Sequence, residues 1–434
     1  MSEVAQTEGI HALWKAPEIP SKYDIIPIHN SDRGSFRRCR RYFDWSSPTR
    51  SNLSLRADLM GINTDLFFGT GIHWALEQYY TPGLRHDPVE SWKTWFSIQW
   101  QGGLVGEEGL DRVYDLEPKP SVSQQEFTAL QAGEDIKPSL WIVRGLEDIL
   151  PDPDGYVYDE LYNLGVAMME GYKLIAAKND GFEVLVAEHD FSIPIWDYEN
   201  DCILKAVDLR EQSPNYGNVL EVHNRGRMDA IYVKPNGKIG ILDHKTSSRI
   251  DEEFFIKLET DEQCTSYLYA GEVEAKFYNL PYAGEPMEEV IYNVLRKAAP
   301  KEPTMVRGGL FSVNRNEESA TYEMLSAFMQ EHGIVYDELP EKHKGYIAWL
   351  RDVGDEQFYV RKLVRRNKAQ LRNAGFRLYL ESMDMLDDKL RIYPNLSNSY
   401  KCLRCAFRAP CLAKEAGYDY EDMIRNNYTR TRDR

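Results

Sequence analysis

Apolar and polar positions alternate with a strand period in the middle of the chain and with a helical period around it. Short apolar runs predict strands in FEVLVAEHDFSIPI, in the pair GRMDAIYV and KIGILDHKTSS, and in MEEVIYNVLRK. A helix is expected in FFGTGIHWALEQYY, with Thr70 as its N-cap, and one or two helices in EEFFIKLETDEQCTSYLYAGEVEA. This order of helix, strand, hairpin, helix and strand predicts a mixed α/β core.

The other segments extend this core without forming a repeat. Residues 1–35 show no regular pattern, and residues 197–224 form an expected excursion before the hairpin. Residues 84–180 are an expected insertion, with helices around 123–132, 139–149 and 158–178. We therefore expect four parts: an N-terminal segment (1–64), a core (65–300), a mainly helical region (301–390) and a cysteine-bearing segment with a basic tail (391–434).

The turn between the two hairpin strands, in YVKPNGKIG, decides which side chains face each other. A two-residue turn of Asn236 and Gly237 would place Asp229 opposite His244. Asp229 and Asp243 would then lie on opposite faces of the sheet, because a shift of one residue exchanges the faces of a strand.

A three-residue turn is the alternative that we favour. It puts Pro235 at the first central position, which suits the fixed φ of proline, and Gly237 in the left-handed position. Counting back from this turn, Asp229 faces Asp243, and Lys245 lies on the same face of the sheet. This register predicts two carboxylates and an amine together at the polar end of the hairpin.

Two facing carboxylates at the end of a buried hairpin repel each other unless a cation or a proton lies between them. Mg²⁺ prefers such oxygen ligands. A metal ion there can bind a phosphate oxygen and help to form a hydroxide nucleophile, while Lys245 orients water or stabilises developing charge. An isolated D-x-K is usually an ordinary strand end. Here Asp229 lies opposite Asp243, so we favour an active site over an ordinary strand end. The reaction expected of such a site is phosphodiester hydrolysis.

The motifs that carry these residues resemble those of the PD-(D/E)XK nuclease superfamily. They are similar in particular to the RecB-like branch with the CRISPR-associated iron–sulfur exonucleases and AddB-type nuclease domains. The similarity lies in GTGIHWALE, GRMDAI, ILDHKTS and DEQCTSYLYA, and it covers about residues 65–80 and 182–297. It implies an α/β, restriction-endonuclease-like fold: a mixed sheet core flanked by helices, with helical insertions and a C-terminal iron–sulfur segment. Residues 84–180 and 300–390 are not explained by it.

The same resemblance implies a role for each matching residue. The expected metal ligands are His73, Asp229, Asp243 and, as a further candidate, His244. The expected catalytic set is Lys245, Asp243, Asp229, Gln263 and Tyr267. Glu77 and Glu188 are weaker candidates with a supporting role. A single histidine is more often a cap or core residue, but the common order of these residues along the chain favours the functional interpretation.

Three of the six cysteines lie within ten residues, in CLRCAFRAPC: Cys402, Cys405 and Cys411. Three thiolates need a fourth ligand, and the resemblance implies Cys39, in FRRCRRYFDW. Four thiolates suit tetrahedral zinc or a [4Fe-4S] cluster, and spacing does not separate the two. The resemblance favours iron–sulfur. A cluster that joins Cys39 to Cys402 would restrict the unfolded chain and act structurally.

The net charge of the protein limits how it could bind nucleic acid. The formal net charge of −17 argues against non-specific coating of DNA, but it leaves room for a local basic groove. Two candidate phosphate-binding groups are Arg37, Arg38, Arg40 and Arg41 around Cys39, and Arg361, Arg365, Lys368 and Arg372 along one expected helical face. The sequence has no run of 18 apolar residues and no signal-peptide pattern, so we expect a cytoplasmic protein without membrane contact.

These observations lead to one functional expectation with two rivals. We expect an Mg²⁺- or Mn²⁺-dependent DNA exonuclease with a structural [4Fe-4S] cluster, acting on DNA with a free end or on single strands. DNA recombination, repair or replication would be its setting, and the proteins of these processes its partners. The rivals are a structure-specific endonuclease of the same fold and a DNA-binding adaptor without catalysis. The sequence has no G-x-x-x-x-G-K-[ST] motif, so unwinding would need another protein.

Overall fold

The structure is a computed structural model of the 434-residue chain. It describes residues 19–56, 64–83, 85–101, 155–211, 213–277, 284, 286–315, 319–353, 357–396 and 399–430. The helices expected around residues 123–132 and 139–149 lie outside these ranges. The helix expected over 158–178 is present as α8 (Tyr156–Asn179). None of the helices in the described ranges is both long and apolar enough to cross a membrane.

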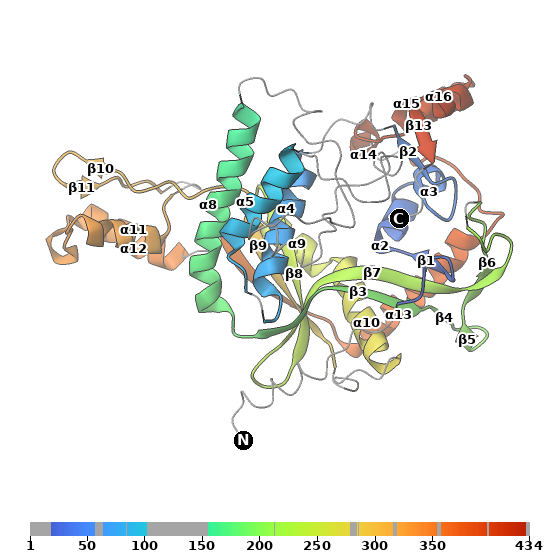
Figure 1. Cartoon of the computed structure of the whole chain (residues 1–434), viewed down its shortest axis with the longest axis horizontal. Coiled ribbons are helices and arrows are strands. Elements are labelled where there is room, and N and C mark those ends of the chain that lie inside the picture. The colour runs from blue at the N-terminus through green and yellow to red at the C-terminus, as the bar shows by residue number, and fades with distance from the viewer. Residues whose placement is uncertain are drawn as a thin grey trace, which may run out of the picture.

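A mixed sheet of seven strands forms the centre of the fold (Figure 1). Five strands follow the order β1-β7-β8-β9-β12, and β3 and β6 also pair with β7. β8 runs parallel to β9, while β7 is antiparallel to β8 and β9 to β12. The strands are β1 (Ile25–Ile28), β3 (Glu183–Pro194), β6 (Lys205–Val207), β7 (Val219–Val233), β8 (Ile239–Ser247), β9 (Glu289–Arg296) and β12 (Tyr359–Arg365). This is the mixed α/β core that the sequence pattern predicts.

Helices cover both faces of the sheet, because its central strands are apolar on both sides (Figure 1). One face, which includes Leu242, packs against α4 (Thr64–Tyr80), α5 (Pro88–Gln101) and α8. The other face, which includes Ile241, packs against α9 (Glu252–Glu259), α10 (Glu262–Phe277) and α13 (Lys368–Leu386). Since side chains alternate along a strand, Asp243 and Lys245 follow Ile241 toward α10, and His244 follows Leu242 toward α4.

The hairpin between β7 and β8 has the three-residue turn. The Lys234 N–H donates to the Lys238 carbonyl at 2.8 Å, and the Gly237 N–H donates to the Lys234 carbonyl at 2.8 Å. Gly237 has a φ of 81°, as the left-handed position of this turn requires. Ile231 pairs with Ile241 in the strands that follow. The register favoured from the sequence is therefore confirmed, and its continuation sets Asp229 against Asp243.

Gly237→Ala is expected to lower the free energy of unfolding by about 1 kcal/mol, because an alanine Cβ disfavours a positive φ. Nothing within 4 Å would meet that Cβ, so the effect is one of backbone strain alone. Gly34→Ala is a matched control inside α2 (Asn30–Arg38), where there is also open space and no positive φ. The control should gain up to about 1 kcal/mol from helix propensity. Urea unfolding of both variants measures the difference; equal shifts would contradict the assigned turn.

Two expectations about secondary structure are wrong. Thr70 lies inside α4, which begins at Thr64, and its Oγ1 donates to the Leu66 carbonyl at 2.9 Å instead of capping the helix. Residues 25–35 are regular, since β1 pairs in parallel with the first part of β7 and α2 follows it. Residues 197–224, the expected excursion before the hairpin, contain regular strands. They contribute to β4 (Trp196–Asp197), β5 (Cys202–Ile203), β6 and the first part of β7.

One part of the chain extends from the side of the sheet (Figure 1). It consists of β10 (Met305–Val306), β11 (Leu310–Phe311), α11 (Tyr322–Glu331), η2 (Tyr336–Glu338) and α12 (Glu341–Val353). Phe311, Leu325 and Tyr346 belong to an apolar cluster within this extension. The extension lies on the side opposite the C-terminal helices in this view.

Residues from both ends of the described chain pack together (Figure 1). β2 (Leu53–Leu55) pairs with β13 (Tyr428–Arg430) in antiparallel fashion. Trp45 of α3 (Arg40–Ser46) shares an apolar cluster with Phe407 and Tyr428. The C-terminal helices are α14 (Ser399–Leu403), α15 (Arg408–Glu415) and α16 (Tyr420–Asn427). This packing brings the cysteine of the N-terminal segment near those of the C-terminal segment.

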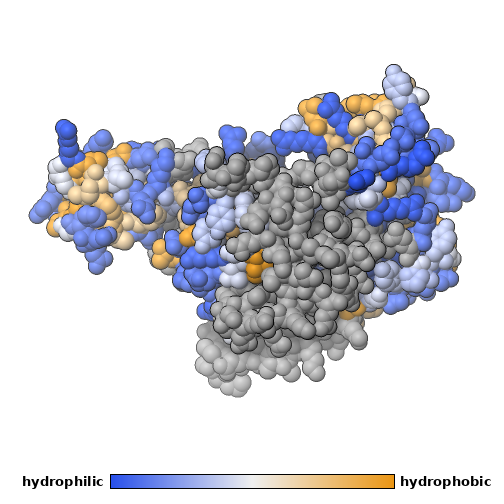
Figure 2. Space-filling model, turned by 45° about the horizontal axis from the view of Figure 1, so that its top comes forward, coloured by the Kyte–Doolittle hydropathy of each residue, from blue (hydrophilic) through white to orange (hydrophobic). Residues whose placement is uncertain are grey.

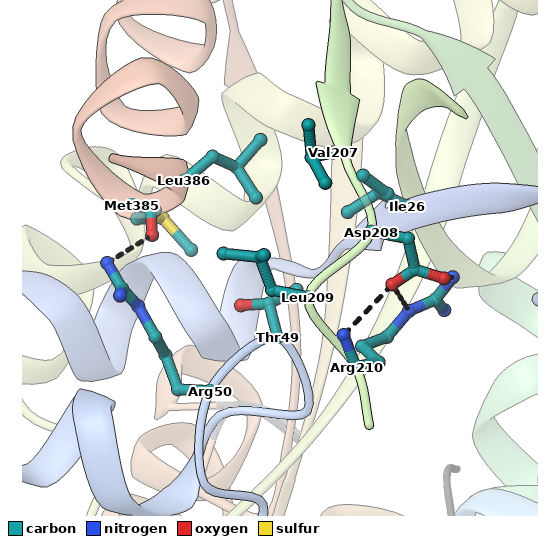
Figure 3. A pocket seen from close by; sticks show the side chains of 9 residues that line it. All are labelled: Ile26, Thr49, Arg50, Val207, Asp208, Leu209, Arg210, Met385 and Leu386. Atoms are coloured by element: carbon teal, nitrogen blue, oxygen red, sulfur yellow. Dashed lines mark hydrogen bonds and ion pairs between the residues drawn. The ribbon is translucent and has the colours of Figure 1, made fainter. Parts of the chain in front are cut away.

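A small cavity lies where β1, the residues after β6 and the end of α13 meet (Figure 3). Its volume of about 10 Å³ is no larger than a water molecule needs. Arg210 donates to Asp208 at 2.7 Å beside it and also donates to the Ile25 carbonyl at 2.8 Å, which ties β1 to this region. Asp208 and Arg210 are both buried. These contacts position β1, and the cavity is too small for a ligand.

A single carboxylate holds α2 against α13. Glu381 accepts from Nε of Arg33 and from Nε of Arg37, at 2.6 Å each, and Arg33 is buried. Glu381→Gln is expected to lower the free energy of unfolding by about 2 kcal/mol, because a buried guanidinium loses its counter-charge. Glu253→Gln removes an exposed ion pair with Lys257 on α9 and serves as the control. It should change stability by less than about 0.5 kcal/mol in the same urea titration.

The Glu381 contribution should also disappear in acid. Burial opposes ionisation, but the hydrogen bonds and charges of Arg37 and Arg33 outweigh it, so the pKa of Glu381 is lowered from its ordinary value of 4.5. A carboxyl with a lowered folded-state pKa contributes its full stability above the unfolded value and loses it as the pH falls through the folded value. The gap between wild type and Glu381→Gln should therefore shrink below pH 4.5. A gap that stays constant in acid would refute this electrostatic explanation.

Candidate active site

The polar end of the hairpin brings the expected aspartates and lysine together. Nζ of Lys245 lies 2.7 Å from Oδ2 of Asp243. Oδ2 of Asp229 accepts the backbone N–H of His244 at 2.7 Å, which fixes the carboxylate of β7 against β8. Asp243 is 3% exposed, so this group lies at the inner end of the site.

A hydrogen-bond chain joins this end of β8 to the first turns of α10. Nζ of Lys245 donates to Oε1 of Gln263 at 3.1 Å, and Nε2 of Gln263 donates to the Tyr267 hydroxyl at 2.7 Å. Gln263 and Tyr267 are four residues apart and therefore lie on one helix face. Gln263 therefore contacts Lys245 directly, and Tyr267 contacts Gln263. The four-residue spacing in the sequence places both side chains on the face of α10 that is turned toward Lys245.

Helix α4 places His73 on the other side of Asp229. Nδ1 of His73 lies 3.4 Å from Oδ2 of Asp229. Burial lowers the pKa of His73, although the charge of Asp229 opposes this shift. The ring is therefore kept neutral, which is the form in which an imidazole can bind a metal ion.

His244 has a different environment from Asp243 and Lys245. Nδ2 of Asn293 donates to its Nδ1 at 2.8 Å and to the Tyr172 hydroxyl at 2.9 Å. The ring also stacks on Tyr80, with the ring centres 5.6 Å apart. Burial lowers the pKa of His244 to about 3, so the ring is neutral. These contacts hold the ring of His244 in place, and its expected metal-ligand role stays a prediction.

The pKa values of the two aspartates are shifted in opposite directions. Burial alone would raise the pKa of Asp229, but His73, His244 and Lys245 outweigh burial and lower it. For Asp243, burial and the charge of Asp229 outweigh Lys245 and raise the pKa to about 7. A buried pair of this kind gains stability from added positive charge.

Lys245 remains charged in this site. Burial by itself would lower the pKa of Lys245, but Asp243 and Asp229 outweigh burial and raise it. A protonated amine can donate hydrogen bonds and balance negative charge, but it cannot accept a proton. The chemistry open to Lys245 is therefore stabilisation of charge and orientation of an oxygen, and not general base catalysis.

Glu77 and Glu188 both lie near Asp229. In the pairing of β3 with β7, Ala187 faces Ala230 and His189 faces Met228, so Glu188 occupies the position beside Asp229. Glu188 has a φ of 48°, which is rare outside glycine. Burial, with the charges of Asp229 and Glu77, raises the pKa of Glu188 to about 8. Burial and the charge of Asp229 raise the pKa of Glu77 to about 7, although Arg227 opposes this shift.

Both glutamates were weaker candidates from the sequence, but a spacing signal exists for Glu77 alone. Glu77 follows His73 by four residues on one helix, so the two share a face. Glu188 comes to Asp229 through strand pairing between distant segments. Arg227 joins this group, since its Nη1 donates to Glu188 at 3.3 Å and its Nε donates to Asp190 at 2.7 Å.

The four cysteines of the expected cluster lie in one region of the fold, and two of them contact the loop at Asn395. The Asn395 N–H donates to Sγ of Cys39 at 3.4 Å, and Sγ of Cys402 donates to the Asn395 carbonyl at 3.7 Å. Burial raises the pKa of Cys405, and the nearby Cys39 and Cys411 raise it further. All four are free thiols. Their sulfur donors fit zinc or an iron–sulfur cluster in chemical type.

The donor types at the hairpin end fit a hard divalent cation. Carboxylate oxygens of Asp229 and Asp243 and an imidazole of His73 are available, and Oδ2 of Asp243 receives no well-aligned hydrogen bond within the described residues. In the ranges that the structure covers, no group of three or more His, Cys, Asp and Glu side chains is arranged as a formed metal site. In this structure the positive charge beside Asp243 comes from Lys245.

The basic segment 361–372 does not form one helical face, so this expectation is wrong. Arg361 and Arg365 lie on β12, and α13 begins only at Lys368. The first part of this segment pairs with β9, an apolar strand that is far away in the sequence. Arg361 is also committed to the interior, since its Nη2 donates to Asp180 at 2.7 Å. These four residues therefore do not act together as a phosphate-binding stripe.

The arginines around Cys39 divide into two kinds. Arg37 pairs with Glu381 and Glu262, and Arg41 is buried with Glu415 at 2.6 Å. These two hold parts of the protein together. The guanidinium groups of Arg38 and Arg40 instead lie over the rings of Tyr42 and Tyr393, at 4.5 and 5.4 Å from the ring centres.

Comparison with models of known protein families identifies the chain. Residues 35–412 match the model of the PD-(D/E)XK nuclease superfamily. This match covers most of the chain and includes the sheet apart from β1, the site at the hairpin end and the three C-terminal cysteines. The protein belongs to the PD-(D/E)XK nuclease superfamily, and its mixed sheet flanked by helices is consistent with a restriction-endonuclease-like fold.

Membership indicates a metal-dependent nuclease with DNA as its substrate. Nucleases of this superfamily typically use Mg²⁺ or Mn²⁺. A search of curated proteins found no match to the chain.

Proposed function

We propose that this protein is an Mg²⁺- or Mn²⁺-dependent DNA exonuclease with a structural [4Fe-4S] cluster, of the RecB-like branch. The observation that carries the proposal is the convergence of Asp229, Asp243 and Lys245 at one end of the hairpin. The exonuclease assignment rests on the resemblance of the His73, Gln263 and cysteine motifs to that branch. Recombination, repair or replication of DNA is the proposed setting.

In this proposal each side chain has a separate task. Asp229, Asp243 and His73 hold the cation, and Asp229 is kept in place by the His244 N–H. A bound Mg²⁺ or Mn²⁺ would polarise the phosphate and lower the pKa of water. Lys245 balances the negative charge that develops on the phosphate, and Gln263 holds the amine toward the site. Asn293 fixes the ring of His244 from behind.

End-labelled linear DNA, single- and double-stranded, tests the proposal when it is incubated with the purified protein and Mn²⁺ or Mg²⁺. Circular single-stranded DNA is the matched substrate without an end. We expect degradation of the linear strands and an intact circle. Cleavage of the circle would instead indicate an endonuclease. An intact linear substrate, with the cluster present, would leave only the adaptor role.

The cluster is tested on the same preparation. Protein purified without oxygen is expected to be brown and to contain iron. A colourless preparation that contains zinc would reject the iron–sulfur assignment and leave the nuclease assignment untouched.

A further inference from the structure

A groove of about 370 Å³ opens between α2 and α10, beside the candidate active site. It is lined by Asn30, Ser31, Arg33 and Arg37 on the side of α2 and by Asp261, Glu262 and Gln263 on the side of α10. Gln263 is the residue whose Oε1 accepts from Lys245. The volume lies in the range of small-ligand sites, which is about 300–1,000 Å³. The groove therefore connects directly with the site where the phosphate would react.

The same helix leads from this groove to the C-terminal segment. The first residues of α2 line the groove, and Arg38 at its end donates from Nη2 to the Lys401 carbonyl at 2.9 Å. Cys39, the next residue, accepts the Asn395 N–H. Helix α2 thus leads from the groove beside the active site to the surface around α14.

Beyond the groove this surface carries aromatic rings paired with arginines. We call it the tyrosine–arginine face and define it by Arg38, Arg40, Tyr42, Tyr393, Tyr400 and Arg404. The Arg404 guanidinium lies 5.3 Å from the centre of the Tyr400 ring. Tyr400 is 64% exposed and Tyr393 is 55% exposed. Both rings are therefore open enough for a base to stack on them, beside an arginine that can contact a phosphate.

The charge around this face is opposite to that of the whole chain. Residues 399–414 contain four Lys or Arg and no Asp or Glu, in a chain with a formal net charge of −17. Figure 2 shows hydrophobic residues beside hydrophilic ones on the C-terminal helices at the upper right. A polyanion that also offers flat apolar surfaces satisfies both features, and single-stranded nucleic acid has this chemistry. A protein partner would need only the apolar part.

We propose that a single strand of DNA runs from the candidate active site through the α2–α10 groove and across the tyrosine–arginine face. The starting point of this path rests on the proposed nuclease function. The groove itself carries no excess of positive charge, because Arg33 and Arg37 are paired with Glu381 and Glu262 and Asp261 also lines it. The groove therefore guides the strand, and the affinity comes from base stacking on the tyrosines and phosphate contacts with the arginines.

Binding is measured apart from cleavage, by fluorescence anisotropy of a labelled oligothymidylate with the full-length protein in buffer without divalent cations. Tyr400→Ala is expected to weaken affinity about tenfold, because one stacked base is lost. Tyr400→Phe keeps the ring and should retain the affinity. Arg404→Ala should reduce the slope of log affinity against log salt by about 0.7, the value for one phosphate contact on a single strand.

A matched pair on the extension provides the control. Lys344 lies 5.9 Å from the ring centre of Tyr336, which is 43% exposed on η2. Tyr336→Ala should leave the affinity unchanged. An equal loss in Tyr336→Ala and Tyr400→Ala, or no loss in Tyr400→Ala, would overturn the proposal. Loss of duplex binding with unchanged single-strand binding would overturn it as well.

Substrate length then separates this path from the nuclease proposal. In Tyr400→Ala the KM for a long oligonucleotide should rise about tenfold, while the KM for one too short to reach α14 stays at the wild-type value. An equal rise for both lengths contradicts the path. Wild-type protein that binds single strands through Tyr400 but cleaves nothing would refute the nuclease function and leave the binding face standing.

Discussion

Lys245→Ala is expected to reduce the rate of DNA cleavage by about 10²–10³-fold, the usual effect of removing one group that stabilises charge in a transition state. The amine is 2.7 Å from Asp243 and donates to Gln263 at 3.1 Å, so it is held toward the carboxylates. Against the effect of burial, Asp243 and Asp229 raise its pKa, which favours the charged form of the amine. Single-turnover kinetics with saturating Mn²⁺ measure the chemical step directly.

Lys234→Ala is the matched control for this experiment. Lys234 belongs to the same hairpin and also forms an ion pair, with Glu289, but it lies at the turn and not at the polar end. We expect this variant to keep the wild-type cleavage rate. Single-strand affinity should be unchanged in both variants, since neither residue belongs to the tyrosine–arginine face. Full activity of Lys245→Ala would remove the lysine from the mechanism even if cleavage is real.

Cys402→Ser is expected to abolish the brown colour and lower the free energy of unfolding by about 2–5 kcal/mol. The reason is the length of chain between Cys39 and Cys402, because a link across a long loop removes much of the freedom of the unfolded chain. The ends of the chain also meet through β2 with β13 and through Trp45 with Phe407. Loss of the cluster should therefore destabilise the C-terminal segment first and the sheet later.

Iron content and guanidinium unfolding measure these effects. Cys202→Ser is the control, since Cys202 is exposed on β5 and is not one of the four gathered thiols. This variant should retain its iron and its stability. Equal iron content in Cys402→Ser and wild type would show that Cys402 is not a ligand.

The hairpin shows how far sequence reasoning reaches. Pro235 and Gly237 have backbone preferences that belong to the residues themselves, so the three-residue turn could be derived without a structure. Side chains alternate along strands, so the turn also fixed Asp229 against Asp243 and Lys245 beside them. This part of the site is local in sequence, and the structure has the same register.

The expectations that were wrong depend on distant partners. Arg361 and Arg365 have the spacing of a helical face, but β9 offers a strand edge and their segment becomes β12. Ile25–Ile28 is too short to predict as a strand alone, and it becomes β1 by pairing with β7. In both cases the hydrogen bonds of a neighbouring strand outweigh a weak local preference.

The sequence by itself determined the α/β class, the hairpin register and the resemblance of its motifs to the superfamily, because these follow from local periodicity, turn chemistry and spacing. Only the tertiary structure placed Glu188 beside Asp229, turned His244 toward Asn293 and joined the groove along α2 to the face around Tyr400. These contacts join segments far apart in the chain. They are set by packing of the whole fold, which no local pattern encodes.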